Sequence, residues 1–176
     1  MPKKNQKKKS AIQTPKDKVL KCLEKNCLLP GTSLNESGRT FSIRKKRGEK
    51  VRFFHLDKGR KRNQGTGRKC LGISPNERIC DLLVVIATKK SSAYIFVELK
   101  VGQATDDAFS QLRDTIKSAQ QKTQCTSQQV YGLIACRGSS PIPVRKERKR
   151  NPGIKIKSRT LQPSISVTEL MKIFNP

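Results

Sequence analysis

Residues 79–100 read ICDLLVVIATKKSSAYIFVELK and contain two strongly apolar runs. Residues 79–87 are apolar almost without interruption, and residues 93–100 repeat this character after a short polar stretch at 88–92. A continuous apolar run is typical of a strand buried on both faces, because a half-exposed strand alternates apolar and polar residues. The stretch therefore predicts two neighbouring central strands, joined by a turn that would make them antiparallel.

The segment that follows predicts a helix and a further buried strand. Thr105 is a suitable N-cap, and Asp106 and Asp107 stand in the first turn, where the helix dipole favours anions. Residues 130–136, VYGLIAC, have the composition of another buried strand. Apolar residues at helical spacing define the face expected to pack on the sheet: Ala108, Phe109, Leu112, Ile116 and Ala119.

Upstream, the sequence predicts a first helix, a hairpin and a loop. The helix covers residues 15–27 and has one apolar face. Residues 40–44 and 51–56 have strand-like composition, and the basic segment between them contains a glycine, so we expect a basic hairpin. Residues 58–69 are rich in Gly, Lys and Arg without periodicity, which predicts a loop.

The order of these elements, a helix, three to four strands, a helix and a strand, indicates an α/β fold with a central mixed sheet flanked by helices. Towards the C-terminus we expect an extended stretch at 153–157 and a closing helix at 167–174 with Ser166 as its cap. The predicted organisation is a disordered basic arm at 1–14, a core at 15–137 that includes the basic hairpin and loop at 40–70, and a basic extension at 138–176.

Two acidic residues stand inside the apolar strands, where burial of an unpaired carboxylate is costly. Asp81 is near the start of the first strand and Glu98 near the end of the second, so antiparallel pairing would bring them together. Lys100 follows Glu98 by two residues and, by the strand period, points to the same face. Two carboxylates are suitable ligands for Mg2+ or Mn2+, and a lysine beside them can orient an attacking water. The alternative is a buried ion pair that only fixes the strand register.

The spacing of these residues resembles a known group of enzymes. Asp81 followed, after sixteen intervening residues, by Glu98-Leu99-Lys100 is similar to the motif of the PD-(D/E)xK nuclease superfamily. The resemblance covers roughly residues 15–137 and implies a restriction-endonuclease-like fold. It also implies that Asp81 and Glu98 bind the metal and that Lys100 assists the attacking water.

The resemblance suggests further site residues. Many such nucleases place a glutamate of the first helix in the site; here the helix offers Glu24, and Glu36 lies in the loop beyond, although a solvated carboxylate is the favoured interpretation of each. Gln111 stands where some members have a polar residue that faces the metal, but its helical phase is off the core face. Cys80 stands where many members have a proline before the first acid.

The charge of the chain indicates a polyanionic partner. Its 176 residues include 39 Lys and Arg against 13 Asp and Glu, a formal charge of +26. Residues 71–135 carry 7 basic and 6 acidic side chains, so nearly all of the excess lies in the flanking segments. Such a density favours nucleic acid, because each neutralised phosphate releases counterions. The residues expected to contact phosphates are Arg44, Lys45, Lys46, Arg47, Arg60, Lys61, Arg62, Arg68, Lys69, Arg145, Lys146, Arg148, Lys149 and Arg150.

Other residue types narrow the function classes. With six Phe, two Tyr and no Trp to stack on unpaired bases, double-stranded DNA is the expected form of the partner, with RNA left open. The six cysteines contain no CxxC pair, and several stand in apolar runs, so we expect buried, reduced side chains rather than a zinc site or a disulfide framework. No apolar run is long enough to span a bilayer, which favours a soluble protein of the cytoplasm or nucleoid.

These observations predict an Mg2+- or Mn2+-dependent endonuclease that hydrolyses phosphodiester bonds of DNA. Without a separate sequence-reading domain, we expect structure-directed or weakly specific cleavage by a homodimer or with a partner subunit, as in restriction, repair, transposition or defence systems. The alternative is a non-catalytic basic nucleic-acid-binding protein, which has no need of two acids and a lysine in apolar strands.

Overall fold

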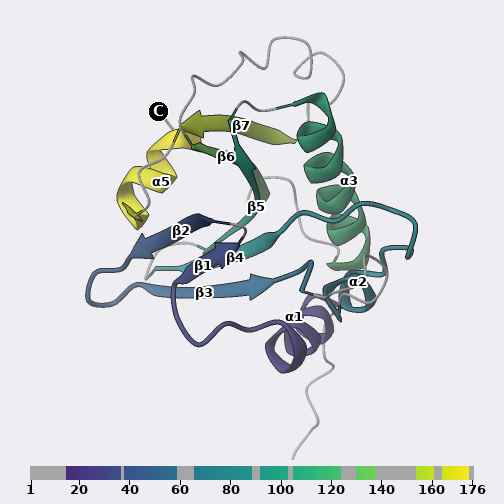
Figure 1. The fold of residues 1–176 in the computed structure, drawn as a ribbon. Helices are drawn as coiled ribbons and strands as arrows, with labels where there is room; N and C mark the ends of the chain where they lie inside the picture. The colour runs from purple at the N-terminus through teal and green to yellow at the C-terminus, as the bar shows by residue number, and fades with distance from the viewer. Residues whose placement is uncertain are drawn as a thin grey trace, which may run out of the picture.

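The fold of the chain, drawn in Figure 1 from a computed structural model, combines two β-sheets with helices. The structure describes residues 15–36, 38–58, 66–88, 92–102, 105–123, 130–137, 154–160 and 164–174. Their elements are α1 (Pro15–Asn26), β1 (Ser33–Glu36), β2 (Arg39–Arg44), β3 (Lys50–His55), α2 (Thr66–Leu71), β4 (Leu82–Ala87), β5 (Ser92–Val101), α3 (Asp106–Thr123), β6 (Val130–Arg137), β7 (Lys155–Thr160), β8 (Ser164–Ser166) and α5 (Val167–Phe174).

The central sheet has five strands in the order β3-β4-β5-β6-β7. The pairs β3–β4 and β4–β5 are antiparallel, whereas the pairs β5–β6 and β6–β7 are parallel. The helix α3 lies between β5 and β6 in the chain. The predicted α/β class with a mixed sheet flanked by helices is therefore confirmed. The expected antiparallel pair of central strands is also present, although β4 begins at Leu82 and leaves residues 79–81 as an approach segment.

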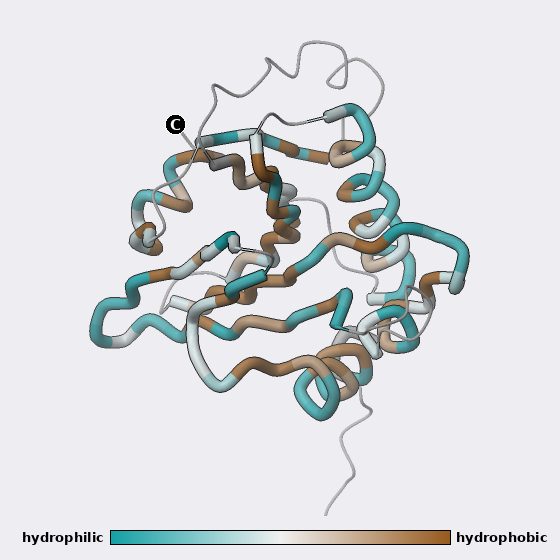
Figure 2. Tube along the Cα trace, viewed as in Figure 1, coloured by the Kyte–Doolittle hydropathy of each residue, from teal (hydrophilic) through white to brown (hydrophobic). Residues whose placement is uncertain are grey.

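Each face of the central sheet packs against a separate layer. Phe96 and Leu83 face a cluster built with α1, α2 and α3, whereas Leu82 and Val97 face a second cluster built with β1, β2, β8 and α5. Figure 1 shows the helical layer on one side of the sheet and α5 with the three-stranded sheet on the other, and Figure 2 shows the apolar residues of the central strands between them. Burial on both faces explains why these strands lack alternation.

Two helices begin at the caps expected from the sequence. Thr105 Oγ1 accepts a hydrogen bond from the N–H of Ala108 at 3.3 Å. Ser166 Oγ accepts one from the N–H of Glu169 at 3.2 Å, and the Glu169 carboxylate accepts one in return from the N–H of Ser166 at 2.8 Å. This reciprocal pair is a capping box, which sets the start of α5.

The predicted basic hairpin is wrong, because β2 and β3 belong to different sheets. β2 pairs with β1 and β8, and β3 pairs with β4. The rings of Phe41 in β2 and Phe53 in β3 instead stack with their centroids 5.9 Å apart. Phe41 and Ile43 of β2 meet Val51 and Phe53 of β3 in the cluster between the two sheets, so the basic residues between the strands form a turn that passes from one layer to the next.

Two other segments differ from expectation. Residues 66–69, predicted as the end of a loop, belong to the helix α2, whose Cys70 and Leu71 are buried in the helical layer. In the C-terminal extension, β7 adds a strand to the central sheet, while β8 and α5 complete the second layer. None of the described helices has the length and apolar composition that a membrane span requires.

Cys22 of α1 and Cys70 of α2 form a disulfide bond, with their Cα atoms 5.6 Å apart. The expectation of reduced cysteines is wrong for this pair, because α1 and α2 pack on the same face and bring together residues separated by 48 positions. Cys27, Cys80 and Cys136 are free and buried, as expected for small apolar side chains.

Gly67 is required where α2 passes the end of β3. A Cβ atom at this position would lie 2.5 Å from the carbonyl oxygen of Leu56 and 2.8 Å from its Cα. We expect Gly67→Ala to lower the free energy of unfolding by about 1–3 kcal/mol, despite the higher helix propensity of alanine. Urea denaturation measures this change, with Gly31→Ala as the control because a Cβ there meets nothing within 4 Å. Equal stability of the two variants would contradict the close approach.

Candidate active site

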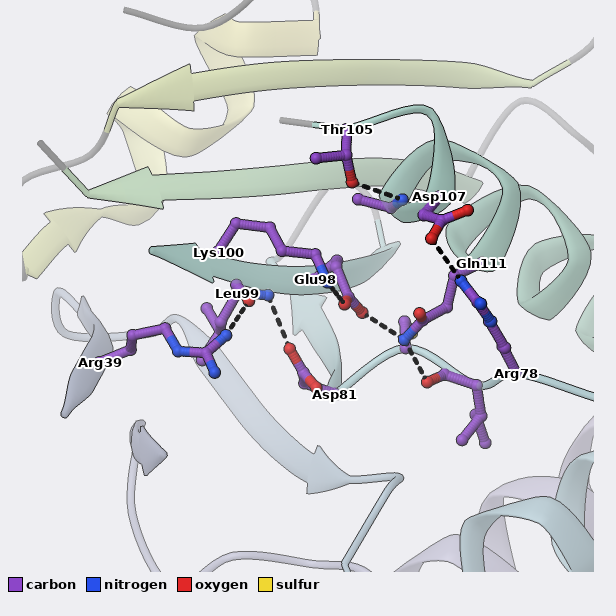
Figure 3. Close-up of polar contacts among 12 residues, drawn as sticks. Arg39, Arg78, Asp81, Glu98, Leu99, Lys100, Thr105, Asp107 and Gln111 are labelled. Carbon is purple, nitrogen blue, oxygen red and sulfur yellow. Dashed lines mark hydrogen bonds and ion pairs between the residues drawn. The ribbon is translucent and has the colours of Figure 1, made fainter. Parts of the chain in front are cut away.

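Asp81 and Glu98 lie opposite each other at one end of the central sheet. Leu82 of β4 pairs with Val97 of β5, so one step before β4 the antiparallel register places Asp81 opposite Glu98. The backbone N–H of Leu99 donates to Asp81 Oδ2 at 2.7 Å, which ties this carboxylate to β5 (Figure 3). The structure thus brings together the two acids in the apolar strands.

The approach segment before β4 is held on both sides. Gln111 Nε2 in α3 donates to the carbonyl of Ile79 at 2.7 Å, and the N–H of Cys80 donates to Thr115 Oγ1 at 3.1 Å. From β3, the N–H of Leu56 donates to the carbonyl of Asp81 at 2.9 Å. Asp81 therefore stands on a segment whose backbone is fixed by a helix on one side and a strand on the other.

Glu98 is only 2% exposed, and both of its carboxylate oxygens have partners. Lys100 Nζ lies 2.7 Å from Oε1, so Lys100 shares the face of Glu98 as the strand period predicts. Gln111 Nε2 donates to Oε2 at 2.8 Å. The helical phase predicts Gln111 off the core face, but its side chain reaches back to Glu98, and Figure 3 shows it between Glu98 and the approach segment.

The two carboxyl groups are more basic than usual. Burial raises the pKa of Asp81 to about 6; the hydrogen bond from Leu99 opposes this rise, and the negative charge of Glu36 adds to it. Burial also raises the pKa of Glu98 to about 7, with the charge of Asp81 as the second cause and the ammonium of Lys100 acting in the opposite direction. The pair therefore holds more negative charge at neutral pH than its surroundings stabilise, which favours a cation beside it.

The hairpin of β1 and β2 brings two further groups to this end of the sheet. Arg39 donates from Nη1 to the carbonyl of Leu99 (Figure 3). Glu36 Oε2 lies 3.4 Å from His55 Nε2, an interaction that lowers the pKa of Glu36. Gly38, with a φ of 75°, provides the conformation that the turn between Glu36 and Arg39 requires. Arg39 and His55 are not predicted from the sequence, although the Ser-Gly dipeptide before Arg39 is a recognisable hairpin signal.

Of the two candidate glutamates, only Glu36 acts on Asp81. Glu24 in α1 pairs with Arg52 of β3. Arg52 lies opposite Val85, four positions along the sheet from Asp81, which corresponds to roughly 13 Å. Glu24 is thus engaged away from the pair of acids, whereas the charge of Glu36 contributes to the raised pKa of Asp81.

Arg68 corrects the predicted set of phosphate contacts. It is 5% exposed, and its Nη1 donates to the carbonyl of Ser74 at 3.2 Å and to the carbonyl of Glu77. Because residues 66–71 form a helix that packs on the core, the guanidinium points inward and donates hydrogen bonds to backbone carbonyls. Arg68 is therefore a buried residue that braces the loop before β4, and its guanidinium is not exposed to a phosphate of DNA.

The other basic candidates are dispersed. Lys69 is exposed on α2, and Arg44 lies 3.7 Å from Glu169 of α5. Lys45, Lys46 and Arg47 are exposed in the turn between β2 and β3, at the end of β4 that is remote from Asp81. The remaining candidates lie outside the described residues: Arg60, Lys61, Arg62, Arg145, Lys146, Arg148, Lys149 and Arg150.

The donor set at the site suits a small divalent cation. Within the described segments, no three or more His, Cys, Asp and Glu side chains are grouped so as to hold a metal ion. Asp81 and Glu98 nevertheless provide two neighbouring carboxylates, the oxygen ligands that Mg2+ and Mn2+ prefer, and their pKa values, raised mainly by burial, indicate negative charge that a cation would stabilise. With two protein ligands, water and phosphate oxygens would complete the coordination.

Comparisons of the chain with models of protein families, with curated proteins and with solved structures find no match. Its function has to be inferred from the chemistry of the site.

Asp81→Asn is expected to stabilise the metal-free protein at pH 8 but not at pH 4. The pKa of Asp81 in the folded protein, about 6, exceeds its ordinary value of 3.8, so the folded state binds the proton more tightly and stability falls as pH rises through this range. The asparagine side chain of the variant carries no charge, so its stability does not fall in this way. We expect the melting temperature of the variant to be about 3–6 °C above that of the wild type at pH 8. Thermal denaturation in EDTA at pH 4, 6 and 8 measures the effect.

Asp114→Asn is the matched control, since Asp114 is exposed on α3 and pairs only with the neighbouring Arg113 among the interactions described. A melting temperature of Asp81→Asn at pH 8 equal to or below that of the wild type would contradict the cost of burying the ionised Asp81 carboxylate.

Proposed function

We propose that the chain is a metal-dependent nuclease that hydrolyses phosphodiester bonds of DNA. The observation that carries this proposal is the convergence of Asp81, Glu98 and Lys100 at one end of the central sheet, with Lys100 Nζ 2.7 Å from Glu98. Two acids and a lysine in this order, on antiparallel strands followed by a helix and a parallel strand, support membership of the PD-(D/E)xK nuclease superfamily. The function proposed is that of an endonuclease.

The residues of the site suit hydrolysis of a phosphodiester. Asp81 and Glu98 would hold Mg2+ or Mn2+, which supplies an activated water and neutralises charge that develops on the phosphate. Lys100, with 29% of its side chain exposed, can donate a hydrogen bond to the attacking water or to a phosphate oxygen. The N–H of Leu99 and the amide of Gln111 orient the two carboxylates, so the ligands are arranged before substrate binds.

The charge distribution supports a long anionic substrate. The formal charge of +26 is carried mainly outside residues 71–135, so affinity would come from surfaces around the site. The turn with Lys45, Lys46 and Arg47 lies beyond the far end of β4, about 20 Å from Asp81 at 3.3 Å per residue. A phosphate contact there requires a duplex that continues roughly six base pairs past the site, which favours DNA over a small phosphoester.

A non-catalytic nucleic-acid-binding protein is the second candidate. Glu98 and Lys100 already neutralise each other, and a buried ion pair of this kind can serve the register of the sheet alone. Under this alternative the protein binds DNA through its basic surfaces and cleaves none.

Substitution of the three site residues tests the proposal. Asp81→Ala, Glu98→Ala and Lys100→Ala should each reduce cleavage by at least about 100-fold, because each removes a metal ligand or the donor to the water. Affinity for DNA in EDTA should remain within a few fold of that of the wild type. Plasmid cleavage with Mg2+, with Mn2+ and with EDTA, together with fluorescence anisotropy of a labelled duplex, gives both quantities.

Asp114→Ala is the control for these variants, since it removes an exposed carboxylate of α3 and should leave cleavage unchanged. Metal-dependent cleavage that persists in Glu98→Ala would rule out the assignment of the site. Binding without cleavage in the wild type would favour the second candidate.

The salt dependence of binding tests the basic turn. Replacing Lys45, Lys46 and Arg47 by Ser should flatten the slope of log affinity against log salt by up to about 2.7, since each phosphate contact contributes about 0.9 on duplex DNA. The control replaces three exposed lysines of α1, Lys18, Lys21 and Lys25, and removes the same charge elsewhere. Affinities at four salt concentrations decide the outcome. An equal change in both triple variants would show that only the net charge matters.

A further inference from the structure

A cavity of about 480 Å³ opens beside the proposed active site. Lys100 and Gln111 line it, and both also contact Glu98. Its volume falls in the range of about 300–1,000 Å³ that is usual for sites that bind a small molecule or a part of one. Whatever fills the cavity therefore lies next to the bond that the site would cleave.

Apart from Lys100, which borders the proposed cleavage site, the charges in the cavity do not suit a phosphate. Each of the three cationic side chains along the described part of its lining faces a carboxylate. Arg78 lies 2.9 Å from Asp107 (Figure 3), Lys100 lies 2.7 Å from Glu98, and the Nη2 atom of Arg68 lies 3.8 Å from Asp57. An anion would have to displace one of these carboxylates, so a neutral, polar occupant is favoured.

Arg68 forms a fixed part of the cavity wall. Its side chain lines the cavity, although only 5% of the residue is exposed. Nη1 donates to two backbone carbonyls, and Nε is buried without a hydrogen-bond partner and out of reach of the cavity. An occupant of the cavity therefore has to form its hydrogen bonds with the other lining residues.

The other walls are both apolar and amide-bearing. Pro75 and Ile79 are the apolar residues of the lining. The side-chain amide of Asn76 carries a donor and an acceptor, whereas Gln111, whose Nε2 already donates to Ile79 and Glu98, keeps its carbonyl oxygen as an acceptor. A flat heterocycle with ring nitrogens, amino groups and carbonyl oxygens at its edge matches such a lining, because that edge offers both donors and acceptors to the amides.

We propose that this cavity holds a nucleobase of the substrate, unstacked from the DNA, from a nucleotide that adjoins the cleaved phosphodiester. This inference rests on the proposed nuclease function and specifies its substrate: DNA with an unpaired nucleotide next to the bond that is cut. A fully paired duplex has to give up stacking and pairing to fill the cavity, whereas a bulged nucleotide is already unpaired. The enzyme would therefore prefer duplexes that contain a bulge.

Binding measured without cleavage tests this inference. Three labelled oligonucleotides are compared by fluorescence anisotropy in EDTA: a paired duplex, the same duplex with one bulged nucleotide, and the same duplex with a bulged abasic residue. We expect the bulged nucleotide to raise affinity at least 10-fold over the paired duplex, and removal of its base to abolish the gain. Equal affinity for the two bulges would overturn the proposal, because it would show that only a flexible or bent duplex is recognised. Failure to bind any of the three would also overturn it.

A variant that fills the cavity provides the second arm. Asn76 is exposed in the loop between α2 and β4, so Asn76→Trp should fold, occlude the cavity and abolish the preference for the bulged nucleotide. Gln121→Trp places the same indole on an exposed position of α3 outside the cavity lining and should retain the preference. A preference that persists in Asn76→Trp would overturn the assignment of the cavity.

The two proposals can fail separately. A base-dependent preference in a protein that cleaves no DNA would retain the cavity and refute the nuclease function. Metal-dependent cleavage at equal rates on paired and bulged duplexes, with no base-dependent affinity, would retain the nuclease and refute the cavity.

Discussion

The central constraint is the burial of Glu98 beside Asp81 at the end of strands that are otherwise apolar. Ionised carboxylates are costly there, and the surrounding elements supply hydrogen bonds and charge to limit that cost. The N–H of Leu99 binds Asp81, while Gln111 and Lys100 each take one oxygen of Glu98. This network links β4, β5 and α3, so the packing of the helix on the sheet and the geometry of the site depend on each other.

The charge of the molecule is organised in two ways that suit different tasks. Around the site and the cavity, cations and carboxylates face each other at short range, as Arg78 does with Asp107. On the outer turn between β2 and β3, Lys45, Lys46 and Arg47 are exposed and next to one another. Paired charges at short range hold the side chains of the site in fixed orientations. Unpaired positive charge at the surface attracts a polyanion but does little to orient it. The proposed nuclease would use the first for chemistry and the second for affinity.

The helical layer determines the shape of the cavity. Arg68 of α2 braces the loop between α2 and β4 by binding the carbonyls of Ser74 and Glu77, and that loop forms one wall. The position of α2 depends in turn on the disulfide between Cys22 and Cys70 and on the close approach that only a glycine permits beside Leu56. A short helix outside the proposed catalytic set thus supports one wall of the cavity.

The amino-acid sequence by itself determined the central strands, the helix α3 and the meeting of Asp81, Glu98 and Lys100, because these depend on apolar runs, caps and the strand period, which are local properties. Tertiary structure alone decided that β2 and β3 separate into two sheets, that Arg68 turns inward, that Cys22 meets Cys70, and that Arg39 and Gln111 reach the site. Each of these depends on contacts between segments distant in the sequence. Composition cannot reveal them, since a basic residue in a polar segment has the same local pattern whether it faces solvent or a buried carbonyl.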